Sequence, residues 1–289
     1  MSTTPESEAT REAVRQRYAG IARDTMAETT EAFGTGCCAP SCCGTEGLDL
    51  TTLATSIGYN AAELSTLPKG ANMGLSCGNP TAIASLQPGE VVLDLGSGGG
   101  FDLFLAGPKV GATGRAIGVD MTPDMLALAR KNTQTYREHT GLDNVEFRLG
   151  EIEHLPVADL SVDVVISNCV LNLSPDKPQV WRDIARVLKP GGRVAVSDLA
   201  LLQPLPAAVA AMLEALVGCV AGAPQVTDTE RMMREAGLTE IRLEPKPEYV
   251  EMMSRRNTPL YQSIAAHIPE GTTPADYLTS LNITARKPS

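Results

Sequence analysis

A short apolar run followed by a glycine-rich loop constrains the fold of this chain more than any other feature. Residues 91–95 read Val-Val-Leu-Asp-Leu, and residues 96–100 read Gly-Ser-Gly-Gly-Gly before a helical segment begins. Glycine lets a backbone turn sharply and lets a ligand approach closely, because no Cβ stands in the way. The order strand, glycine loop, helix is typical of an open α/β sheet with a ligand at the loop.

Short apolar runs alternate with helical segments from Gly89 to Asp198, which favours a parallel sheet wound by strand and helix units. A helix is expected to open at Thr122-Pro123, and another to close at residues 189–192, Lys-Pro-Gly-Gly. The sequence therefore predicts an α/β fold with a doubly wound, Rossmann-like core. Its five parallel strands are expected at residues 91–95, 116–119, 145–149, 163–167 and 193–197.

The two ends of the chain do not follow this rhythm. A helix is expected from Thr4-Pro5 to Gly34, and Asn60 with Glu63 suggests a capping box for a second helix. Beyond Asp198 the pattern indicates further helices and strands, at 205–222, 229–236, 240–243 and 281–285. We therefore expect three parts: an N-terminal helical arm with a cysteine-rich loop (1–70), a ligand-binding core (71–199) and a C-terminal substrate-binding cover region (200–289).

Composition excludes several classes of protein. With 289 residues, 43% of them apolar, the chain can bury a sizeable core, and its net charge of −10 disfavours nucleic acid as a partner. The first residues lack the apolar region of a signal peptide, and the longest apolar stretch, 205–223, is interrupted by Glu214. The sequence therefore predicts a cytoplasmic protein without a membrane span. In such a compartment its seven cysteines favour metal, metalloid or redox chemistry over structural disulfides.

The spacing of the glycines indicates which ligand the loop holds. A dinucleotide fingerprint needs its third glycine where this chain has Phe101, which weakens the pyrophosphate interpretation. The observed pattern, acidic-x-Gly-x-Gly-x-Gly with Asp94 in the acidic position, is similar to that of class I methyltransferases. Their cofactor, S-adenosylmethionine, offers an ammonium and a carboxylate to the loop, so an acid at this position suits it.

Further polar residues follow the next strands in the order that such a cofactor requires. Asp120 ends the second strand, where a carboxylate accepts ribose hydroxyls, and Asn168 ends the fourth. Glu151 and Ile152 follow the third strand, where the adenine would lie. The candidate residues for S-adenosylmethionine are Asp94, Gly96, Ser97, Gly98, Gly100, Asp120, Met121, Glu151, Ile152 and Asn168.

Three separate cysteines are expected near this ligand. Cys169 directly follows Asn168, Cys77 precedes a helix start at Asn79-Pro80, and Cys219 lies in the apolar segment after the fifth strand. A cysteine in an apolar helix is more often a small buried hydrophobe than a ligand. Three thiols around one sheet edge suggest instead a soft electrophilic atom. The histidines, at 139, 154 and 267, have no zinc-like spacing with these cysteines.

These residues resemble the arsenite S-adenosylmethionine methyltransferases, the ArsM-type family. The resemblance extends from about Tyr59 to Gly222, and the contexts of the three cysteines are its most specific part. Its motifs are residues 74–80 (GLSCGNP), 92–98 (VLDLGSG), 118–122 (GVDMT), 167–172 (SNCVLN) and 218–222 (GCVAG).

The resemblance implies that Cys77, Cys169 and Cys219 bind trivalent arsenic, with no other metal. The arsenic lone pair would attack the methyl group of S-adenosylmethionine, giving methylated arsenicals for detoxification. A thiol reductant, glutathione or thioredoxin, would restore the reduced state. Leu75 stands where some relatives carry tyrosine, so the number of methyl groups added stays open.

Other interpretations also remain open. Cys37, Cys38, Cys42 and Cys43 form two adjacent pairs in the predicted loop, and they are either incidental or a metalloid-capturing or disulfide-forming flap. The resemblance implies that a cysteine of this region can pair with Cys77. Alternative functions are a methyltransferase for a small organic substrate and a thiol-based metalloid-binding protein whose cofactor fold is vestigial.

Overall fold

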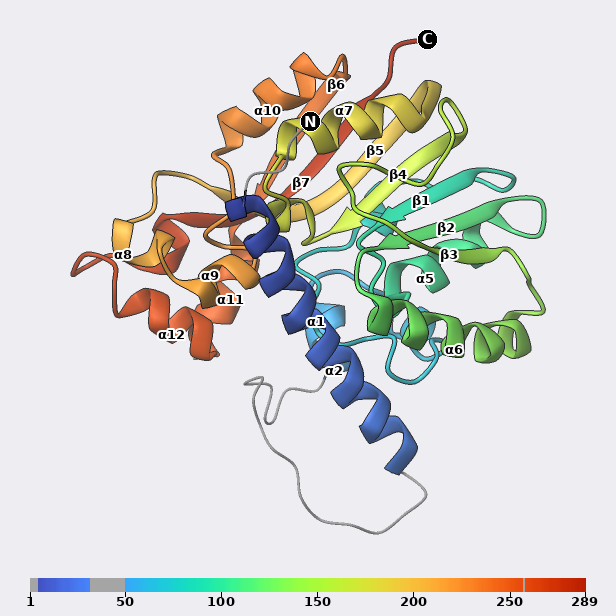
Figure 1. Cartoon of the computed structure of the whole chain (residues 1–289), viewed down its shortest axis with the longest axis horizontal. Helices are drawn as coiled ribbons and strands as arrows, with labels where there is room; N and C mark the ends of the chain where they lie inside the picture. The colour runs from blue at the N-terminus through green and yellow to red at the C-terminus, as the bar shows by residue number, and fades with distance from the viewer. Residues whose placement is uncertain (1–4, 32–49, 257) are drawn as a thin grey trace.

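A single seven-stranded sheet forms the centre of the computed structural model, which describes residues 5–31, 50–256 and 258–289. The strand order is β3-β2-β1-β4-β5-β7-β6, and β1 to β5 are mutually parallel (Figure 1). The last two strands are antiparallel to their neighbours and complete one edge of the sheet. The strands are β1 (Val91–Leu95), β2 (Arg115–Asp120), β3 (Val145–Leu149), β4 (Val162–Asn168), β5 (Leu188–Leu201), β6 (Thr239–Lys246) and β7 (Leu278–Arg286).

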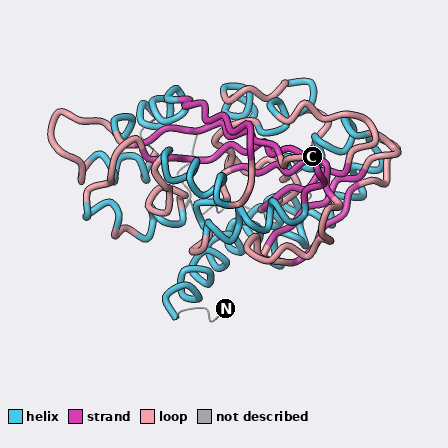
Figure 2. Tube along the Cα trace, turned by 90° about the horizontal axis from the view of Figure 1, so that it is seen from above, coloured by secondary structure: helices cyan, strands magenta, loops and turns pink. Residues whose placement is uncertain are grey.

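Helices cover both faces of the sheet, which explains why its central strands are mostly apolar (Figure 2). On one face, Val92 packs in a cluster with residues of α4 (Pro80–Ile83) and α5 (Phe101–Val110). On the opposite face, Leu93 packs in a cluster with residues of α7 (Lys177–Val187) and α10 (Val226–Glu235). The sheet is therefore doubly wound, as the sequence predicted.

The long first helix lies across the carboxyl edge of the parallel strands. Helix α1 (Pro5–Glu31) contacts α6 (Pro123–Thr140) on one side and α9 (Leu213–Val217) on the other (Figure 1). Its predicted end at Gly34 lies outside the described residues. After the gap, the chain forms α2 (Leu50–Ser56) and α3 (Ala61–Leu64), and Asn60 caps α3 by accepting a hydrogen bond from the backbone N–H of Ala62.

The region after β5 differs from its prediction. A continuous helix over 205–222 is wrong, because the chain forms only α8 (Ala207–Ala210) and α9 before it turns. Cys219 has φ of 63°, in the left-handed region, so a right-handed helix cannot pass through it. The helix before β5 also ends earlier than expected, at Val187. The rest of this region includes α11 (Pro247–Arg255), α12 (Pro259–Ala265) and a short turn, η2 (Pro274–Asp276), while another short turn, η1 (Leu171–Leu173), follows β4.

None of the helices in the described residues combines the length and the apolar character needed to cross a bilayer.

Candidate active site

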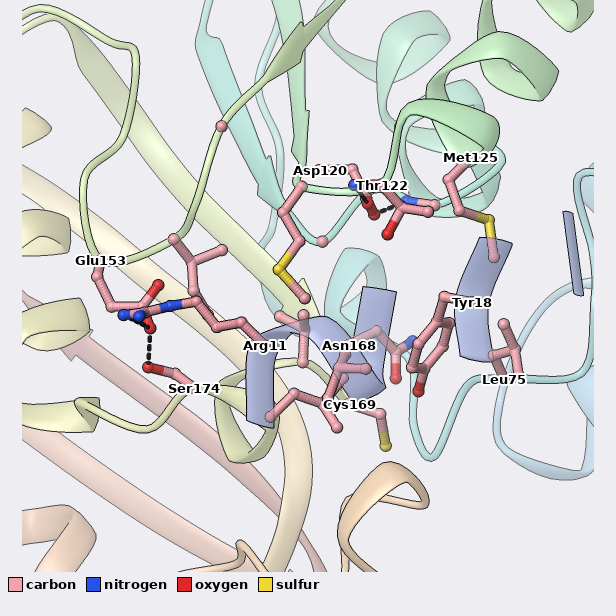
Figure 3. A pocket seen from close by; sticks show the side chains of 18 of the residues that line it. Arg11, Tyr18, Leu75, Asp120, Thr122, Met125, Glu153, Asn168, Cys169 and Ser174 are labelled. Atoms are coloured by element: carbon pink, nitrogen blue, oxygen red, sulfur yellow. Dashed lines mark hydrogen bonds and ion pairs between the residues drawn. The ribbon is translucent and has the colours of Figure 1, made fainter. Parts of the chain in front are cut away.

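A chamber opens at the carboxyl ends of the parallel strands, and we call it the glycine chamber (Figure 3). It encloses about 730 Å³ of space, part of it open to solvent. A smaller adjoining cavity continues it on the other side of the glycine loop and is lined by Asp94 and Ser97. Of the other residues predicted from sequence, the chamber is lined by Gly96, Gly98, Asp120, Met121, Ile152, Asn168 and Cys169.

The glycine loop needs its glycines for two different reasons. Gly96 has φ of 66°, and a Cβ there would stand 2.3 Å from Val170, so the backbone requires glycine for packing. Gly98 has φ of 51°, but the nearest heavy atom to its Cβ position is 3.6 Å away. A side chain at Gly98 would therefore fill chamber space. Gly100 plays a structural part, because a Cβ there would meet Phe104 at 2.6 Å.

Asp120 fixes the loop from the end of β2. One carboxylate oxygen accepts the backbone N–H of Gly98 at 2.9 Å, and the other accepts that of Thr122 at 2.8 Å. Burial raises the pKa of this carboxyl, and the two backbone donors oppose the rise. The carboxylate thereby joins the loop to the start of α6 at the position predicted for ribose binding.

A second acid, Asp102, lies beside Asp94 on the far side of the loop. Both are buried, and burial raises the pKa of each, to about 6 for Asp102. The Tyr59 hydroxyl donates to one Asp102 oxygen at 2.7 Å, and the side-chain amide of Asn168 donates to the other at 3.1 Å. Asn168 also accepts the backbone N–H of Cys77 at 3.1 Å. Sequence reasoning missed Asp102 and Tyr59, although an acid in the first turn after the loop was a visible signal.

This arrangement fits S-adenosylmethionine. The cofactor carries positive charge on its ammonium and sulfonium groups. The buried carboxyl groups of Asp94 and Asp102 can supply negative charge, and no basic side chain among the described residues bonds to either. A cation at this place would stabilise their ionised forms. Gly98 leaves room for a ligand beside the backbone, and Asp120 offers a carboxylate to a ribose.

Helix α1 closes the glycine chamber, a contribution that sequence reasoning did not foresee. Figure 3 shows Arg11 and Tyr18 beside the residues of the sheet edge, and both line the chamber. The buried Arg11 guanidinium lies 3.2 Å from the buried Glu153 carboxylate and 3.5 Å from Glu151. Ser174 donates a second hydrogen bond to Glu153 at 2.7 Å. Glu151 therefore anchors the helix that covers the chamber and does not line the chamber itself.

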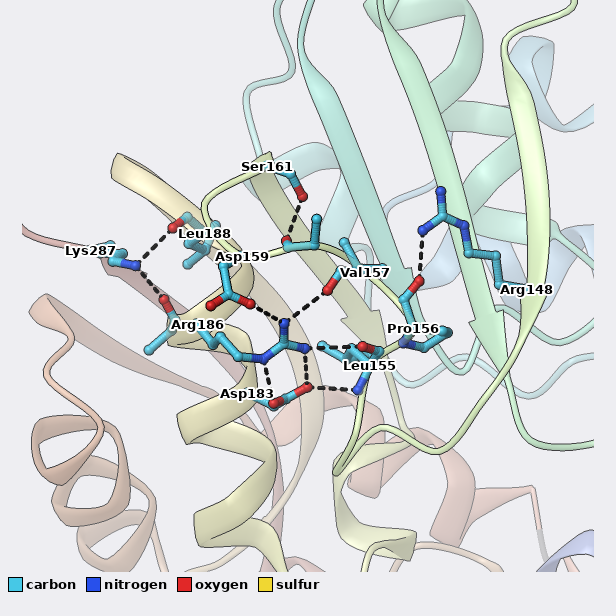
Figure 4. Close-up of polar contacts among 12 residues, drawn as sticks. Arg148, Leu155, Pro156, Val157, Asp159, Ser161, Asp183, Arg186, Leu188 and Lys287 are labelled. Carbon is cyan, nitrogen blue, oxygen red and sulfur yellow. Dashed lines mark hydrogen bonds and ion pairs between the residues drawn. The ribbon is translucent and has the colours of Figure 1, made fainter.

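The loop after β3, which carries Glu151 and Ile152, is bonded to two arginines, Arg186 and Arg148, and Arg148 donates to the Pro156 carbonyl at 2.7 Å (Figure 4). Arg186 on α7 donates to the backbone carbonyls of Leu155 and Val157 at 3.0 and 2.9 Å. The same guanidinium is paired with Asp183 at 2.8 Å, and this bond raises the pKa of Arg186 above its ordinary value. Arg186 thus fixes the adenine edge of the predicted site.

The three predicted arsenic-binding cysteines meet at the carboxyl ends of β4 and β5. Cys77 and Cys169 form a disulfide, so in this structure Cys77 is paired with Cys169 and not with a cysteine of the N-terminal loop. Cys219 is free and buried, and its thiol donates a hydrogen bond to the Cys169 carbonyl at 2.8 Å. Asp198, which sequence reasoning missed, has a carboxylate oxygen within 4.8 Å of both disulfide sulfurs. Cys37, Cys38, Cys42 and Cys43 lie outside the described residues.

Cys169 and Cys219 line a second, larger space of about 1,680 Å³, part of it open to solvent, which we call the cysteine chamber. Cys169, Tyr18 and Leu75 line both chambers, so the two spaces meet at these side chains. Burial raises the pKa of the Cys219 thiol well above its ordinary value, and the charge of Asp198 raises it further. Cys219 is therefore a neutral thiol in the arsenic-free protein.

The neighbourhood of Cys219 also contains a buried acid and a lysine. Burial raises the pKa of Asp198 to about 7, and its oxygens accept the backbone N–H groups of Leu171 and Leu199. Burial lowers the pKa of Lys177, whose ammonium donates to the Ser174 carbonyl at 2.8 Å.

Comparison with known proteins identifies the family. Residues 86–237 match the family model described as a methyltransferase domain. The arsenite methyltransferase of Halobacterium salinarum is 45% identical, over 98% of this chain and 68% of that protein. The arsenite methyltransferase of Aquipseudomonas alcaligenes is 45% identical over 55% of this chain and 47% of that protein. The chain thus spans about half to two thirds of the length of these relatives.

Solved structures agree with the sequence comparison. An arsenic (III) S-adenosylmethionine methyltransferase from Chlamydomonas reinhardtii has a TM-score of 0.59 and 32% identity, covering 83% of this chain and 74% of that one. A putative sarcosine dimethylglycine methyltransferase from Galdieria sulphuraria, at 21% identity and a TM-score of 0.56, shares the fold. The chain therefore has the class I methyltransferase fold and belongs to the arsenite methyltransferase family.

Proposed function

We propose that this chain methylates trivalent arsenic with S-adenosylmethionine as methyl donor, holding the arsenic on Cys77, Cys169 and Cys219. The observation that carries the proposal is the position of Cys169. It lines the glycine chamber next to Asn168, it lines the cysteine chamber, and it contacts both other cysteines. A metalloid bound there lies at the junction of the two chambers.

Before arsenic binds, the disulfide between Cys77 and Cys169 has to be reduced. Two thiols of a reductant supply two electrons and two protons, giving two cysteine thiols and a reductant disulfide. Glutathione or thioredoxin is the reductant we propose. Arsenite then exchanges its hydroxyls for the thiols of the three cysteines, and each departing hydroxide leaves as water with the thiol proton.

The residues of the site act mainly by positioning. Asp94, Asp102 and Asp120 bind the donor, and helix α1 covers it and excludes water. When bound, S-adenosylmethionine supplies a methyl carbon on a sulfonium, which the arsenic lone pair attacks while S-adenosylhomocysteine leaves. Arsenic held by thiolates has no proton to remove, so no general base is needed. Fixing the two reactants at the chamber junction removes an entropic barrier.

The proposal also covers the roles of the three parts of the chain, the N-terminal cysteines and the cellular location. The core over 71–199 binds the donor, while 1–70 and 200–289 supply the arm and the cover. The cysteines at 37, 38, 42 and 43 act in metalloid capture or disulfide exchange. The protein works in the cytoplasm.

The direct test is incubation of the reduced protein with arsenite, S-adenosylmethionine and glutathione, followed by arsenic speciation. We expect methylated arsenic from the parent protein and a loss of about a hundredfold in the Cys169→Ser and Cys219→Ser variants. Calorimetry with S-adenosylmethionine should give the same affinity for both variants as for the parent. Folded, reduced protein that yields no methylated arsenic would refute the proposal.

A small organic substrate is the second candidate, because apolar side chains such as Leu199, Met253 and Leu260 line the cysteine chamber. Methyl transfer to such a substrate does not depend on thiols. Turnover that survives both serine substitutions would favour this candidate. A metalloid-binding protein without catalysis would bind arsenite but show no heat on titration with S-adenosylmethionine.

A further inference from the structure

Two of the described residues that line the cysteine chamber carry a hydroxyl group without a hydrogen-bond partner. The hydroxyls of Thr258 and Tyr261 are both shielded from solvent, and neither is bonded to any group in the part of the chain that the structure describes. Buried hydroxyls are rarely left unpaired, because each such group costs desolvation free energy. An unpaired pair in one chamber points to a ligand that is polar.

The local structure keeps both hydroxyls available. Thr258 is the N-cap residue of α12, a position where threonine usually bonds to its own helix, yet its side chain makes no such bond here. Tyr261 lies three residues later on the same helix and is 4% exposed. Both residues line the cysteine chamber together with Cys169 and Cys219. The start of α12 therefore brings two buried, unpaired hydroxyls to the wall of the space that holds the thiols.

Tyr249 and Cys219 are electrostatic neighbours of the Tyr261 hydroxyl. Burial raises the pKa of Tyr261 well above its ordinary value, and Tyr249 and Cys219 raise it further. The Tyr261 hydroxyl is therefore a neutral group near the Cys219 thiol at any working pH. It can donate one hydrogen bond and accept others.

The charge of the chamber indicates what kind of polar ligand fits. Among the described residues that line it, none is acidic, and its one charged side chain is Arg17, which is exposed. A small oxyanion would find only this one cation at the rim. A neutral molecule with several hydroxyl groups suits two neutral hydroxyls in a largely apolar space.

We propose that the hydroxyls of Tyr261 and Thr258 form a subsite that receives trivalent arsenic as its neutral trihydroxide, before the thiols displace those hydroxyls. This inference rests on the proposed function and extends it to the form of the substrate. At each exchange one As–S bond forms and one As–O bond breaks. The thiol proton leaves with the hydroxide as water, and arsenic stays trivalent.

The test compares Tyr261→Phe with Tyr277→Phe, a matched control. Tyr277 packs in the same apolar cluster but does not line the chamber. In Tyr261→Phe we expect the KM for free arsenite to rise about fivefold to tenfold, the factor that one neutral hydrogen bond supplies. The kcat, the KM for S-adenosylmethionine and the melting temperature should not fall or rise appreciably, and the control should match the parent throughout.

Arsenic supplied as its tris-glutathione complex separates recognition from packing. That complex carries no hydroxyl on arsenic, so Tyr261→Phe should use it as well as the parent does. An equal loss with both arsenic forms would overturn the subsite, as would an unchanged KM for free arsenite. Thr258→Val removes the second hydroxyl and is expected to raise the same KM, which keeps the test decisive if Tyr261→Phe folds poorly.

Calorimetric titration with arsenite, without methyl donor, distinguishes this inference from the proposed function. The titration uses a Cys169→Ser, Cys219→Ser background, in which arsenic keeps hydroxyls because these thiols cannot displace them. If the parent makes no methylated arsenic but this background binds arsenite more tightly than the same background with Tyr261→Phe, the function fails and the subsite stands. If the parent methylates arsenic and the two backgrounds bind arsenite equally, the function stands and the subsite fails.

Discussion

The thiol of Cys219 donates a hydrogen bond to the backbone carbonyl of Cys169 over 2.8 Å, across 50 positions of sequence. The contact brings the turn after α9 against the end of β4, where Cys169 adopts φ of 55°. Both cysteines thus occupy left-handed backbone positions, and their side chains reach one chamber. The free cysteine is held as a hydrogen-bond donor, which is the neutral form of the thiol.

We predict that Cys219 adds nothing to the net proton exchange when arsenite binds to the reduced protein between pH 6 and 8. Burial raises the pKa of Cys219 well above its ordinary value, so the group starts as a thiol, and its proton leaves with hydroxide as water. Calorimetry of the parent and of Cys219→Ser, in two buffers of different ionisation enthalpy, measures this directly. An uptake larger by about one proton per arsenic in the parent would mean that Cys219 is a thiolate before binding, since each thiolate releases one hydroxide.

We predict that affinity for S-adenosylmethionine falls as pH drops below about 6. The pKa of Asp102 is raised to about 6 by burial, so its carboxylate is protonated at lower pH and no longer attracts a cation. The dissociation constant should rise by up to about tenfold per pH unit, measured by calorimetry from pH 5 to 8. A flat profile in the parent protein would contradict the assigned role of Asp102.

The raised pKa of Asp102 has the opposite effect on the stability of the fold, which falls as pH rises. Because the folded pKa of Asp102 lies above its ordinary value of 3.8, stability is lost as pH rises from about 4 to about 6 and stays low above it. Asp102→Asn should therefore raise the unfolding free energy at pH 8 by about 1 to 2 kcal/mol. It should also weaken S-adenosylmethionine binding and flatten its pH profile. Lower stability at pH 8 would count against this explanation.

Gly98 and Gly111 form a matched pair for testing the cofactor site. Both have positive φ, 51° and 68°, so alanine at either costs about 1 to 2 kcal/mol of stability. No atom lies within 4 Å of the Cβ position at Gly111, which is remote from the chamber, whereas Gly98 lines it. Gly98→Ala should weaken S-adenosylmethionine binding by tenfold or more, and Gly111→Ala should leave it unchanged. Equal affinities would show that the glycine loop does not contact the donor.

Arg186 and Arg182 lie one turn apart on α7 and differ in their hydrogen-bond partners. Arg186 bonds to two backbone carbonyls and two carboxylates, while Arg182 bonds to Gln179. Arg186→Lys should lower the unfolding free energy by about 2 kcal/mol, because lysine cannot satisfy this planar set of acceptors. Arg182→Lys should change it by less than about 0.5 kcal/mol. Denaturant unfolding of both variants checks this, and equal losses would argue against the network.

The parallel sheet was predictable because both of its faces are covered. Strands buried on both faces read as continuous apolar runs, and turns with Gly and Pro mark their ends, as at Thr122-Pro123. The polar residues that follow the strands, Asp120 and Asn168, were predictable for the same reason, since the carboxyl ends of parallel strands share one edge. The helix over 205–222 was mispredicted, because a left-handed turn at Cys219 leaves no mark in an apolar sequence.

Contacts between distant segments were beyond sequence reasoning. Arg11 pairs with Glu153 across 142 positions, and Tyr59 bonds to Asp102 across 43. The periodicity of apolar residues along the chain does not predict such a pair. A charged residue on a helix is instead expected to face solvent. The sequence therefore predicted helix α1 as an appended arm, whereas its residues line both chambers. The pairing of Cys77 with Cys169 is of the same kind.

The side-chain amide of Asn168 joins the acidic part of the site to the cysteines. Its nitrogen bonds to Asp102, which lines the cavity adjoining the glycine chamber, and its oxygen bonds to the backbone of Cys77 beside the thiols. A ligand that moves this amide at one end changes the free energy of the group at the other end. Thermodynamic linkage then requires reciprocity: the factor by which the methyl donor changes the affinity for arsenic equals the factor by which arsenic changes the affinity for the donor.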